Sequence, residues 1–157
     1  MKVKMQVAGD DFEYDVHEKL YFDPEHVFAE IGKQSGKLAW WHSLVALKDQ
    51  EIEDAKIMLD KLLADRELDY RKNSDDLVAE YGKVTEGVIR ASVDSDSLVI
   101  DAKKRLSHLK KEGGLLKAMS KGMDTRSVLM ATAGSAQKRE IETRLRSSID
   151  AASRSKE

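Results

Sequence analysis

The stretch LAWWHSLVALKDQEIEDAKIMLDKLLADRELDY, residues 38–70, contains no glycine or proline and has the periodicity of a long amphipathic helix. Its apolar face has a mean spacing of about 3.5 residues and consists of Trp41, Val45, Ile52, Ala55, Leu59 and Leu62. Lys48 is the one residue of this face that is out of place. A helix of this length spans roughly 50 Å. Because one such helix cannot bury its own apolar face, we expect it to pair with others.

The residues before this stretch predict a helix start and an N-terminal β-hairpin. Asp23-Pro24-Glu25 places an N-cap residue before a proline at the first helical position, and Gly32 or Gly36 is expected to kink or interrupt the helix that follows. Residues 2–16 alternate on both sides of Ala8-Gly9-Asp10-Asp11, which is typical of a hairpin or of a flexible arm with that tendency.

A short, well-marked helix is expected after the long one. Residues 73–76 form a turn and helix-cap cluster, and a linker ends at Lys83. In YGKVTEGVIRASVDSD, residues 81–96, Thr85 is a good N-cap and Val88, Ile89 and Val93 form a small apolar face. We interpret this segment as a corner that reverses the chain between two long helices.

Two further helical segments are predicted towards the C-terminus. Asp96 is the expected N-cap of a helix that runs to about Lys121, and its apolar face comprises Val99, Ala102, Leu106, Leu109, Gly113 and Leu116. Asp124-Thr125 is expected to open a fourth segment that ends near Ile149, with apolar positions at Val128, Leu129, Ala133, Ile141, Leu145 and Ile149. The tail ASRSKE, residues 152–157, is expected to fray.

Composition narrows the class of protein. Of 157 residues 36% are charged, only 6% are aromatic and one is proline, which favours long solvated helices. No apolar run approaches the roughly 20 residues of a membrane span, and no signal peptide is evident, so we expect a cytoplasmic protein. There is no cysteine, and the four histidines share no metal-ligand spacing. Because no catalytic constellation is found, we do not expect an enzyme, and no cofactor or metal is implied.

Charge is distributed unevenly along the chain. From residue 101 onward there are 14 basic and 7 acidic residues, a balance of +7, whereas residues 1–100 hold 13 basic and 22 acidic residues, a balance of −9. Lys103, Lys110, Lys117 and Lys121 recur on one helical edge, with Lys104 and Lys111 further round and Arg105 on the other flank. Such a stripe can follow phosphates by charge alone. The alternative is a solvated helix face, or attraction between the two halves of different subunits.

Several segments, taken in order, resemble a phage protein family. They are Asp23 followed by the tryptophans near residue 41, LDYR at residues 68–71, KVTE at residues 83–86 with Ile89, Val93 and Asp96, and GSAQKRE at residues 134–140. In this order and spacing, over about residues 20–142, the chain is similar to UvsY-type recombination mediators of tailed phages.

The resemblance implies a non-enzymatic accessory protein of homologous recombination. Such proteins bind single-stranded DNA, form ring-like homo-oligomers and help a RecA-like recombinase replace the single-strand-binding protein. The family places basic residues just before Leu-Asp-Tyr, where this chain has Asp65, Arg66 and Glu67, so only Arg66, Arg71 and Lys72 remain as cations near that contact. This departure shifts the expected DNA contact towards the stripe on residues 103–121.

The sequence thus predicts an all-α protein of long antiparallel helices in an oligomeric assembly. Residues 1–20 are expected to form the arm or hairpin, residues 21–150 the helical oligomerisation and DNA-binding domain, and residues 151–157 a disordered tail. A phage structural or scaffolding oligomer without a nucleic-acid role is the main alternative. An inhibitor that binds a host nuclease or DNA ends is a third possibility.

Overall fold

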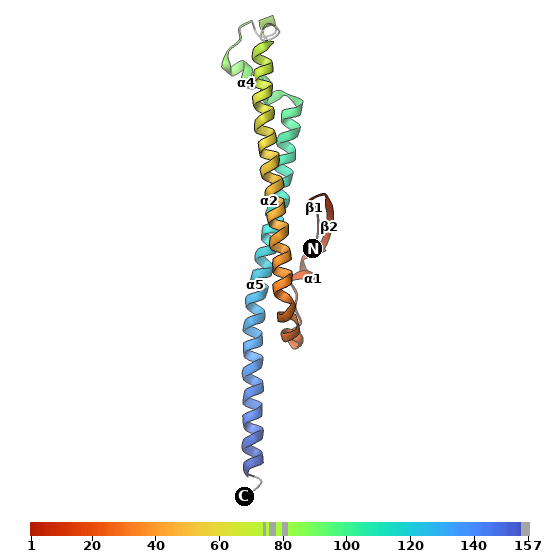
Figure 1. Ribbon diagram of the computed structural model, residues 1–157, viewed down its shortest axis with the longest axis vertical. Coiled ribbons are helices and arrows are strands. Elements are labelled where there is room, and N and C mark those ends of the chain that lie inside the picture. Colours follow the sequence, from red (N-terminus) through yellow and green to blue (C-terminus); the bar gives the residue numbers. More distant parts are fainter. Residues whose placement is uncertain (74, 76–77, 80–81, 155–157) are drawn as a thin grey trace. The chain divides into compact units, whose positions relative to one another are not determined.

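The computed structural model describes residues 1–73, 75, 78–79 and 82–154, and side-chain environments as far as residue 149. Its elements are β1 (Lys2–Val7), β2 (Asp10–Asp15), α1 (Val16–Leu20), the 3-10 helix η1 (Pro24–His26), α2 (Val27–Lys72), α4 (Glu86–Ser95) and α5 (Ser97–Arg154) (Figure 1). The predicted all-α class with an N-terminal hairpin is confirmed. The oligomeric assembly stays a prediction.

The chain divides into two compact units. Unit 1 contains residues 1–5, residues 11–44 and the chain from residue 116 onward, and unit 2 contains residues 6–10 and 45–115. Both α2 and α5 contribute to both units.

The hairpin of β1 and β2 closes through two residues with positive φ, Ala8 at 52° and Gly9 at 86°. Two successive positive φ angles match the right-handed twist of the flanking strands. Alternate side chains of β1 are buried, as the period of two in the sequence requires. The expected hairpin is therefore confirmed.

Helix α2 is continuous from Val27 to Lys72, so the expectation that Gly32 or Gly36 would interrupt it is wrong. Each glycine weakens a helix by about 1 kcal/mol relative to alanine. That is too little to break a helix whose neighbouring turns are buried against α5. The expected start is confirmed, because the Asp23 carboxylate accepts a hydrogen bond from the Glu25 N–H at 2.9 Å.

Helix α4 is the short helix that the sequence predicts. The Thr85 hydroxyl accepts a hydrogen bond from the Val88 N–H at 3.3 Å, which confirms the N-cap. Ile89 and Val93 are buried with core residues of α2 and α5. Tyr81, and Ser74 and Asp76 of the expected turn, lie outside the described residues.

Asp96 separates α4 from α5 and confirms the other predicted cap. Its N–H bonds the Val93 carbonyl at the end of α4, and its carboxylate accepts from the Leu98 N–H at 2.9 Å at the start of α5. One residue thereby ends one helix and begins the next.

Helix α5 is also continuous, so the predicted break at Asp124-Thr125 is wrong. The Thr125 hydroxyl bonds the Lys121 carbonyl one turn earlier at 3.1 Å and caps no helix start. The helix extends to Arg154 and thus includes residues 152–154 of the tail, whereas residues 155–157 lie outside the described part.

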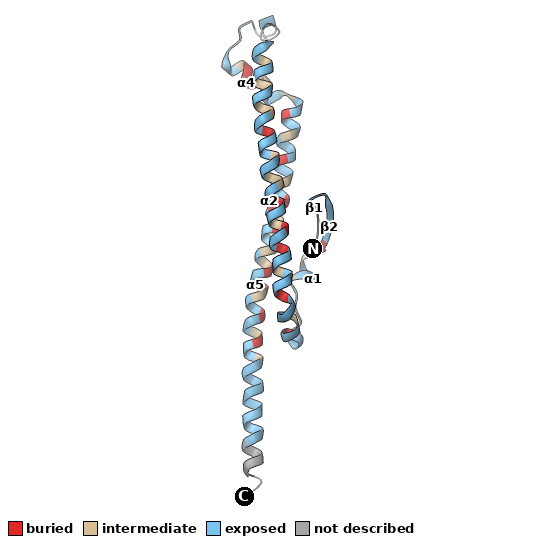
Figure 2. Ribbon diagram, viewed as in Figure 1, coloured by how far each residue is buried: buried red, intermediate tan, exposed pale blue. Residues whose placement is uncertain are grey.

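The buried face of α5 in unit 1 differs from the expected one. It is formed by Met119, Met123 and Met130, whereas Val128 and Leu129 are 66% and 55% exposed. Ile141, Leu145 and Ile149 are exposed as well (Figure 2). Gly134, next to Ile31 and Phe28 of α2, is the last buried residue of α5 among those described.

The paired helices are antiparallel in each unit. In unit 1, Glu30 of α2 contacts Arg126 of α5 and Ile31 lies against Gly134, while Gln34, further along α2, contacts Met123. In unit 2, Lys48 of α2 contacts Glu112 of α5, and Tyr70 near the end of α2 contacts Asp96. In each unit the residue numbers increase along α2 in the direction in which they decrease along α5. The two helices are therefore antiparallel, as predicted.

Lys48, which the apolar pattern marks as out of place, is buried to 1% exposure in unit 2. Its ammonium lies 2.8 Å from the carboxylates of both Glu51 and Glu112 and donates to the Gln6 carbonyl. Burial by itself would lower the pKa of Lys48, but hydrogen bonds to Glu112 and Glu51 outweigh it and raise the pKa above its usual value. Lys48 therefore belongs to the helix interface as a charged residue.

Candidate nucleic-acid interface

The cations that the sequence places on α5 are all exposed: Lys103, Lys104, Arg105, Lys110, Lys111, Lys117 and Lys121. The first five belong to unit 2, and Lys117 and Lys121 belong to unit 1. Lys103, Lys110 and Lys117 lie beside the buried face of α5, which includes Val99, Leu106 and Leu116, and Arg105 lies on the other flank of that face. We call these seven residues the α5 cationic edge.

Two members of the edge make ion pairs within unit 2. The Lys103 ammonium lies 2.7 Å from the carboxylate of Asp94, and the Lys104 ammonium lies 3.4 Å from that of Asp101. Both pairs are on the surface, where water screens them and each contributes at most about 1 kcal/mol. A phosphate could therefore compete for these lysines.

Four members of the edge make no ion pair within the described part of the chain. They are Arg105, Lys110 and Lys111 in unit 2 and Lys121 in unit 1. A cation without a carboxylate partner keeps its full positive potential for an external anion. These four residues are the strongest candidates for phosphate contacts.

The cations around Tyr70 are engaged in holding unit 2 together. Arg66 lies 3.4 Å from the carboxylate of Asp96, which also accepts a hydrogen bond from the Tyr70 hydroxyl at 3.4 Å. The Arg71 guanidinium bonds Glu67 at 2.7 Å and Glu86 at 2.8 Å.

Arg71 therefore ties the end of α2 to the start of α4. Hydrogen bonds to Glu67 and Glu86 raise the pKa of the Arg71 guanidinium. Lys72 is exposed and makes no ion pair with the described residues. Of the three cations predicted near Leu-Asp-Tyr, only Lys72 is left for an external partner.

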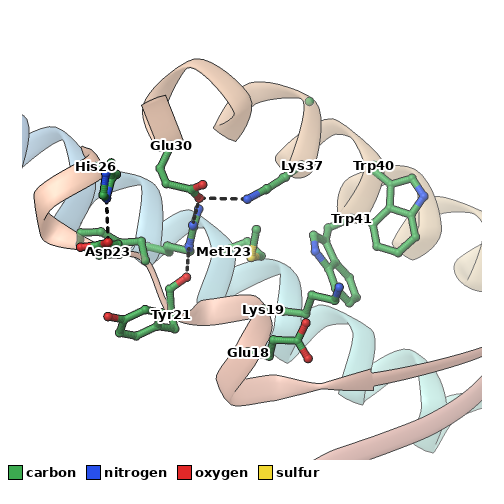
Figure 3. A pocket seen from close by; sticks show the side chains of 13 residues that line it. Glu18, Lys19, Tyr21, Asp23, His26, Glu30, Lys37, Trp40, Trp41 and Met123 are labelled. Carbon is green, nitrogen blue, oxygen red and sulfur yellow. Dashed lines mark hydrogen bonds and ion pairs between the residues drawn. The ribbon is translucent and has the colours of Figure 1, made fainter. Parts of the chain in front are cut away.

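Unit 1 contains a pocket that sequence reasoning missed. It has a volume of about 770 Å³ and lies between α1 with the segment after it and α2, with α5 behind (Figure 3). Its lining residues are Glu18, Lys19, Tyr21, Phe22, Asp23, His26, Glu30, Gly36, Lys37, Trp40, Trp41, Met123 and Arg126. The only signal in the sequence is Gly36, one turn before Trp40 on the same helix.

Arg126 organises one wall of this pocket. It is 3% exposed, and its guanidinium bonds the Gln34 side chain, the Glu30 carboxylate at 2.6 Å and the Tyr21 carbonyl at 3.2 Å. The guanidinium also lies 5.7 Å from the centre of the Phe22 ring, within cation–π range. Arg126 thereby fixes the segment between α1 and η1 against the two helices.

The tryptophans occupy the other end of the pocket. Trp41 is 2% exposed and packs edge to face on Tyr14 with ring centres 5.0 Å apart, so the predicted core role of Trp41 is confirmed. Trp40, the neighbour of Trp41 in the sequence, is 47% exposed. The two indoles contact each other edge to face at 4.9 Å.

Most of the acidic side chains that line the pocket accept a hydrogen bond from a basic side chain. Hydrogen bonds from Lys37 and then Arg126 lower the pKa of Glu30, and a hydrogen bond from His26 lowers the pKa of Asp23. His42, outside the pocket, is 3.4 Å from the carboxylate of Asp124 on the surface. No cluster of three metal-binding side chains occurs among the residues that the structure describes.

No helix in the described ranges is long and apolar enough to cross a lipid bilayer. Comparison with models of protein families, with curated proteins and with solved structures finds no match to this chain.

Proposed function

We propose that this protein is a non-enzymatic, oligomeric accessory factor of homologous recombination that binds single-stranded DNA through the α5 cationic edge. In this function it helps a RecA-like recombinase replace the single-strand-binding protein. The observation that supports DNA binding is the group Arg105, Lys110, Lys111 and Lys121, which is exposed and has no ion pair in the described chain. The step from DNA binding to recombination rests on the resemblance to the mediator family.

The arrangement suits contact with phosphates rather than reading of sequence. Lysines seven residues apart on a helix are about 10 Å apart along its axis, so the edge follows an extended backbone. Ammonium groups on flexible stems bind phosphates as point charges with little dependence on the base. We therefore expect weak binding per chain, little sequence preference and strong dependence on salt.

Oligomerisation would multiply these weak contacts. Beyond Gly134, α5 exposes Ile141 and Leu145, which continue the same helical face that is buried at Met123 and Met130. An isolated helix of about 20 residues is only marginally stable in water. A second copy that covers this face would stabilise the helix and repeat the cationic edge, so that binding gains through effective concentration.

The main test measures DNA affinity against salt for single-stranded and duplex DNA. The parent should prefer single strands, and its log affinity should fall linearly with log salt. Replacing Lys110, Lys111 and Lys121 with Ala should weaken binding to all sequences and reduce the slope by roughly 0.7 for each phosphate that the variant no longer neutralises. A control with Lys2, Lys4 and Lys56 changed to Ala removes the same charge from other exposed positions and should bind like the parent.

If the parent binds neither form of DNA at low salt, the proposal fails. Preference for duplex ends would instead support the end-binding inhibitor. If both triple variants lose the same affinity, only net charge matters and the α5 edge is a solvated face.

A helical scaffolding oligomer without a nucleic-acid role is the second candidate, and the exposed Ile141 and Leu145 favour it equally. Changing both residues to Asp should lower the native mass measured by light scattering and leave the core of unit 1 intact. Val128→Asp, at an exposed position on the other side of α5, is the control and should leave the mass unchanged. A scaffold predicts that the mass changes while DNA has no effect in any variant.

A further inference from the structure

One lining residue of the pocket of unit 1 is a glycine within a helix. Gly36 lies within α2, where glycine destabilises the helix, and it lines the pocket. A Cβ atom built on Gly36 meets nothing within 4 Å. Core packing therefore does not require a glycine at this position. A side chain at this position would begin beside the pocket without a clash at its Cβ atom.

Aromatic surface is available inside the pocket. Trp40 and Tyr21 both line it and are 47% and 70% exposed, and Figure 3 shows Trp40 next to Trp41 at one end and Tyr21 at the other. Phe12 contacts Trp40 edge to face, with ring centres 6.1 Å apart, which supports the indole from outside the pocket. A supported, half-exposed indole can stack on a flat ring without a large entropic loss.

The charges of the pocket do not suit a phosphate group. Lys19, Lys37 and Arg126 are balanced by Glu18, Asp23 and Glu30. Lys37 and Arg126 already bond Glu30, while the side chains of Glu18 and Lys19 make no hydrogen bond or ion pair with the described residues. The charged groups left for a ligand are thus the Glu18 carboxylate and the Lys19 ammonium, beside the aromatic rings.

We propose that this pocket receives one base of the bound single strand. The base would stack on Trp40, and its polar edge would bond Glu18 and Lys19, while the phosphates stay outside the pocket. A volume of about 770 Å³ is within the range of small-molecule sites and exceeds the need of a single base. This inference rests on the proposed binding of single-stranded DNA, and it adds a contact that does not depend on phosphate charge.

The test compares oligo(dT) with an abasic oligonucleotide of the same length, which has the same phosphates but no bases. Stacking on an aromatic side chain strengthens binding by about tenfold per base. The parent should therefore bind oligo(dT) about tenfold more tightly than the abasic strand. Both tryptophans of the chain line the pocket, so their fluorescence should change with oligo(dT) and not with the abasic strand.

Gly36→Leu places a side chain in the pocket lining one turn before Trp40 and should reduce this preference while abasic binding is unchanged. Gly32→Leu is the matched control, because Gly32 also lies in α2 and has equal room for a Cβ atom, with nothing within 4 Å, but does not line the pocket. Trp40→Ala should lose the preference as well. Circular dichroism and the native mass should be the same for all variants.

Equal parent affinity for the two strands would overturn the base pocket and leave electrostatic DNA binding standing. A preference that survives in Trp40→Ala would overturn it as well. If neither strand binds at low salt, the proposed function fails, and the base pocket fails with it.

Discussion

Each unit contains a buried cation between α2 and α5, but the cation is on α2 in unit 2 and on α5 in unit 1. In unit 2 the cation is Lys48 on α2, and its main partner is Glu112 on α5. In unit 1 the cation is Arg126 on α5, and its partners are Glu30 and Gln34 on α2. Both cations also bind a backbone carbonyl in the first 21 residues, that of Gln6 or of Tyr21.

The sites of Lys48 and Arg126 differ in the number of carboxylates around the cation and in how far these carboxylates are exposed to water. Lys48 faces two carboxylates, and the side chain of Glu112 is only 10% exposed. Arg126 shares Glu30 with Lys37, and the Glu30 side chain is 24% exposed. An apolar pair in either place could stabilise the helices as well or better, whereas removal of one partner leaves a buried charge unpaired. We infer that unit 2 depends more strongly on its ion pair.

Lys48→Met is expected to give the largest loss of stability. It leaves the buried Glu112 without Lys48, with only the exposed His108 at 3.4 Å and the Gln6 N–H as remaining partners in the described chain. Breaking a buried pair in this way destabilises a protein by roughly 3–5 kcal/mol. Urea unfolding followed by circular dichroism measures the effect. The double variant Lys48→Met, Glu112→Leu should recover part of the loss, because the unpaired charge is removed. A loss below about 1 kcal/mol in the single variant would show that water reaches Glu112 and would contradict the inferred difference.

Arg126→Met should have a smaller effect than Lys48→Met under the same conditions. Glu30 keeps Lys37 and partial contact with water, and Gln34 keeps its hydrogen bond to the Met123 carbonyl at 3.1 Å. The expected loss is roughly 1–3 kcal/mol, as for a buried hydrogen-bonding group that loses its partner. If Arg126→Met is the more damaging of the two variants, the ranking of the two centres is reversed.

Acid should destabilise unit 2 through Glu112. Burial by itself would raise the pKa of Glu112, but hydrogen bonds from Lys48 and the Gln6 N–H outweigh it and lower the pKa below its usual value of 4.5. A carboxyl with a lowered folded pKa stabilises the fold above pH 4.5, and this contribution is lost as the pH falls through the folded value. The loss per proton is at most about 1.4 kcal/mol per pH unit.

The measurement for this prediction is the free energy of unfolding between about pH 3 and pH 7, which spans the window in which carboxyl groups titrate. Glu112→Gln should give a shallower acid limb than the parent. Lys48, with its pKa raised above 10.5, stays charged over this range and adds no slope. Identical acid limbs for the parent and the variant would exclude Glu112 as a source of the pH dependence.

Substitutions at the adjacent Gly113 and Gly114 in unit 2 should give the smallest change in stability. A Cβ on Gly113 would lie 2.8 Å from Ile52 Cδ1, whereas a Cβ on Gly114 meets nothing within 4 Å. Gly114→Ala should therefore stabilise the helix by about 0.5–1 kcal/mol. Gly113→Ala gains the same helix propensity but displaces Ile52, so its melting temperature should be lower than that of Gly114→Ala. Equal melting temperatures would show that Ile52 moves aside freely.

Local periodicity explains how much of the fold could be predicted. Val99, Leu106 and Leu116 are buried as expected, because one apolar face of a helix can be found from spacing alone. The caps at Thr85 and Asp96 are confirmed for a similar reason, since a cap is an interaction between near neighbours. The false break at Asp124-Thr125 shows the limit of such signals. A cap residue within a helix that is already packed remains helical.

The interactions that could not be predicted join residues far apart in the sequence. Lys48 was recognised as exceptional, but its pairing with Glu112 depends on the register between α2 and α5, which no local pattern gives. The pocket was missed because Arg126 and Met123 come from α5 and the other lining residues come from the first 41. The exposure of the cationic edge was predictable, whereas the ion pair of Lys103 with Asp94 depends on where α4 ends.

The position of α4 has a consequence for the order in which the fold forms. Tyr70 and Asp96, which meet across the corner, are 26 residues apart, whereas Glu30 and Arg126 are separated by 96 residues. The loop between Tyr70 and Asp96 therefore costs about 1 kcal/mol less conformational free energy to close than the loop between Glu30 and Arg126. Within unit 2, pairing of α2 with α5 can then advance from the corner, turn by turn, with each step needing only a small further closure. The ten residues of α4 would thereby bring the facing residues of the two helices together early in folding.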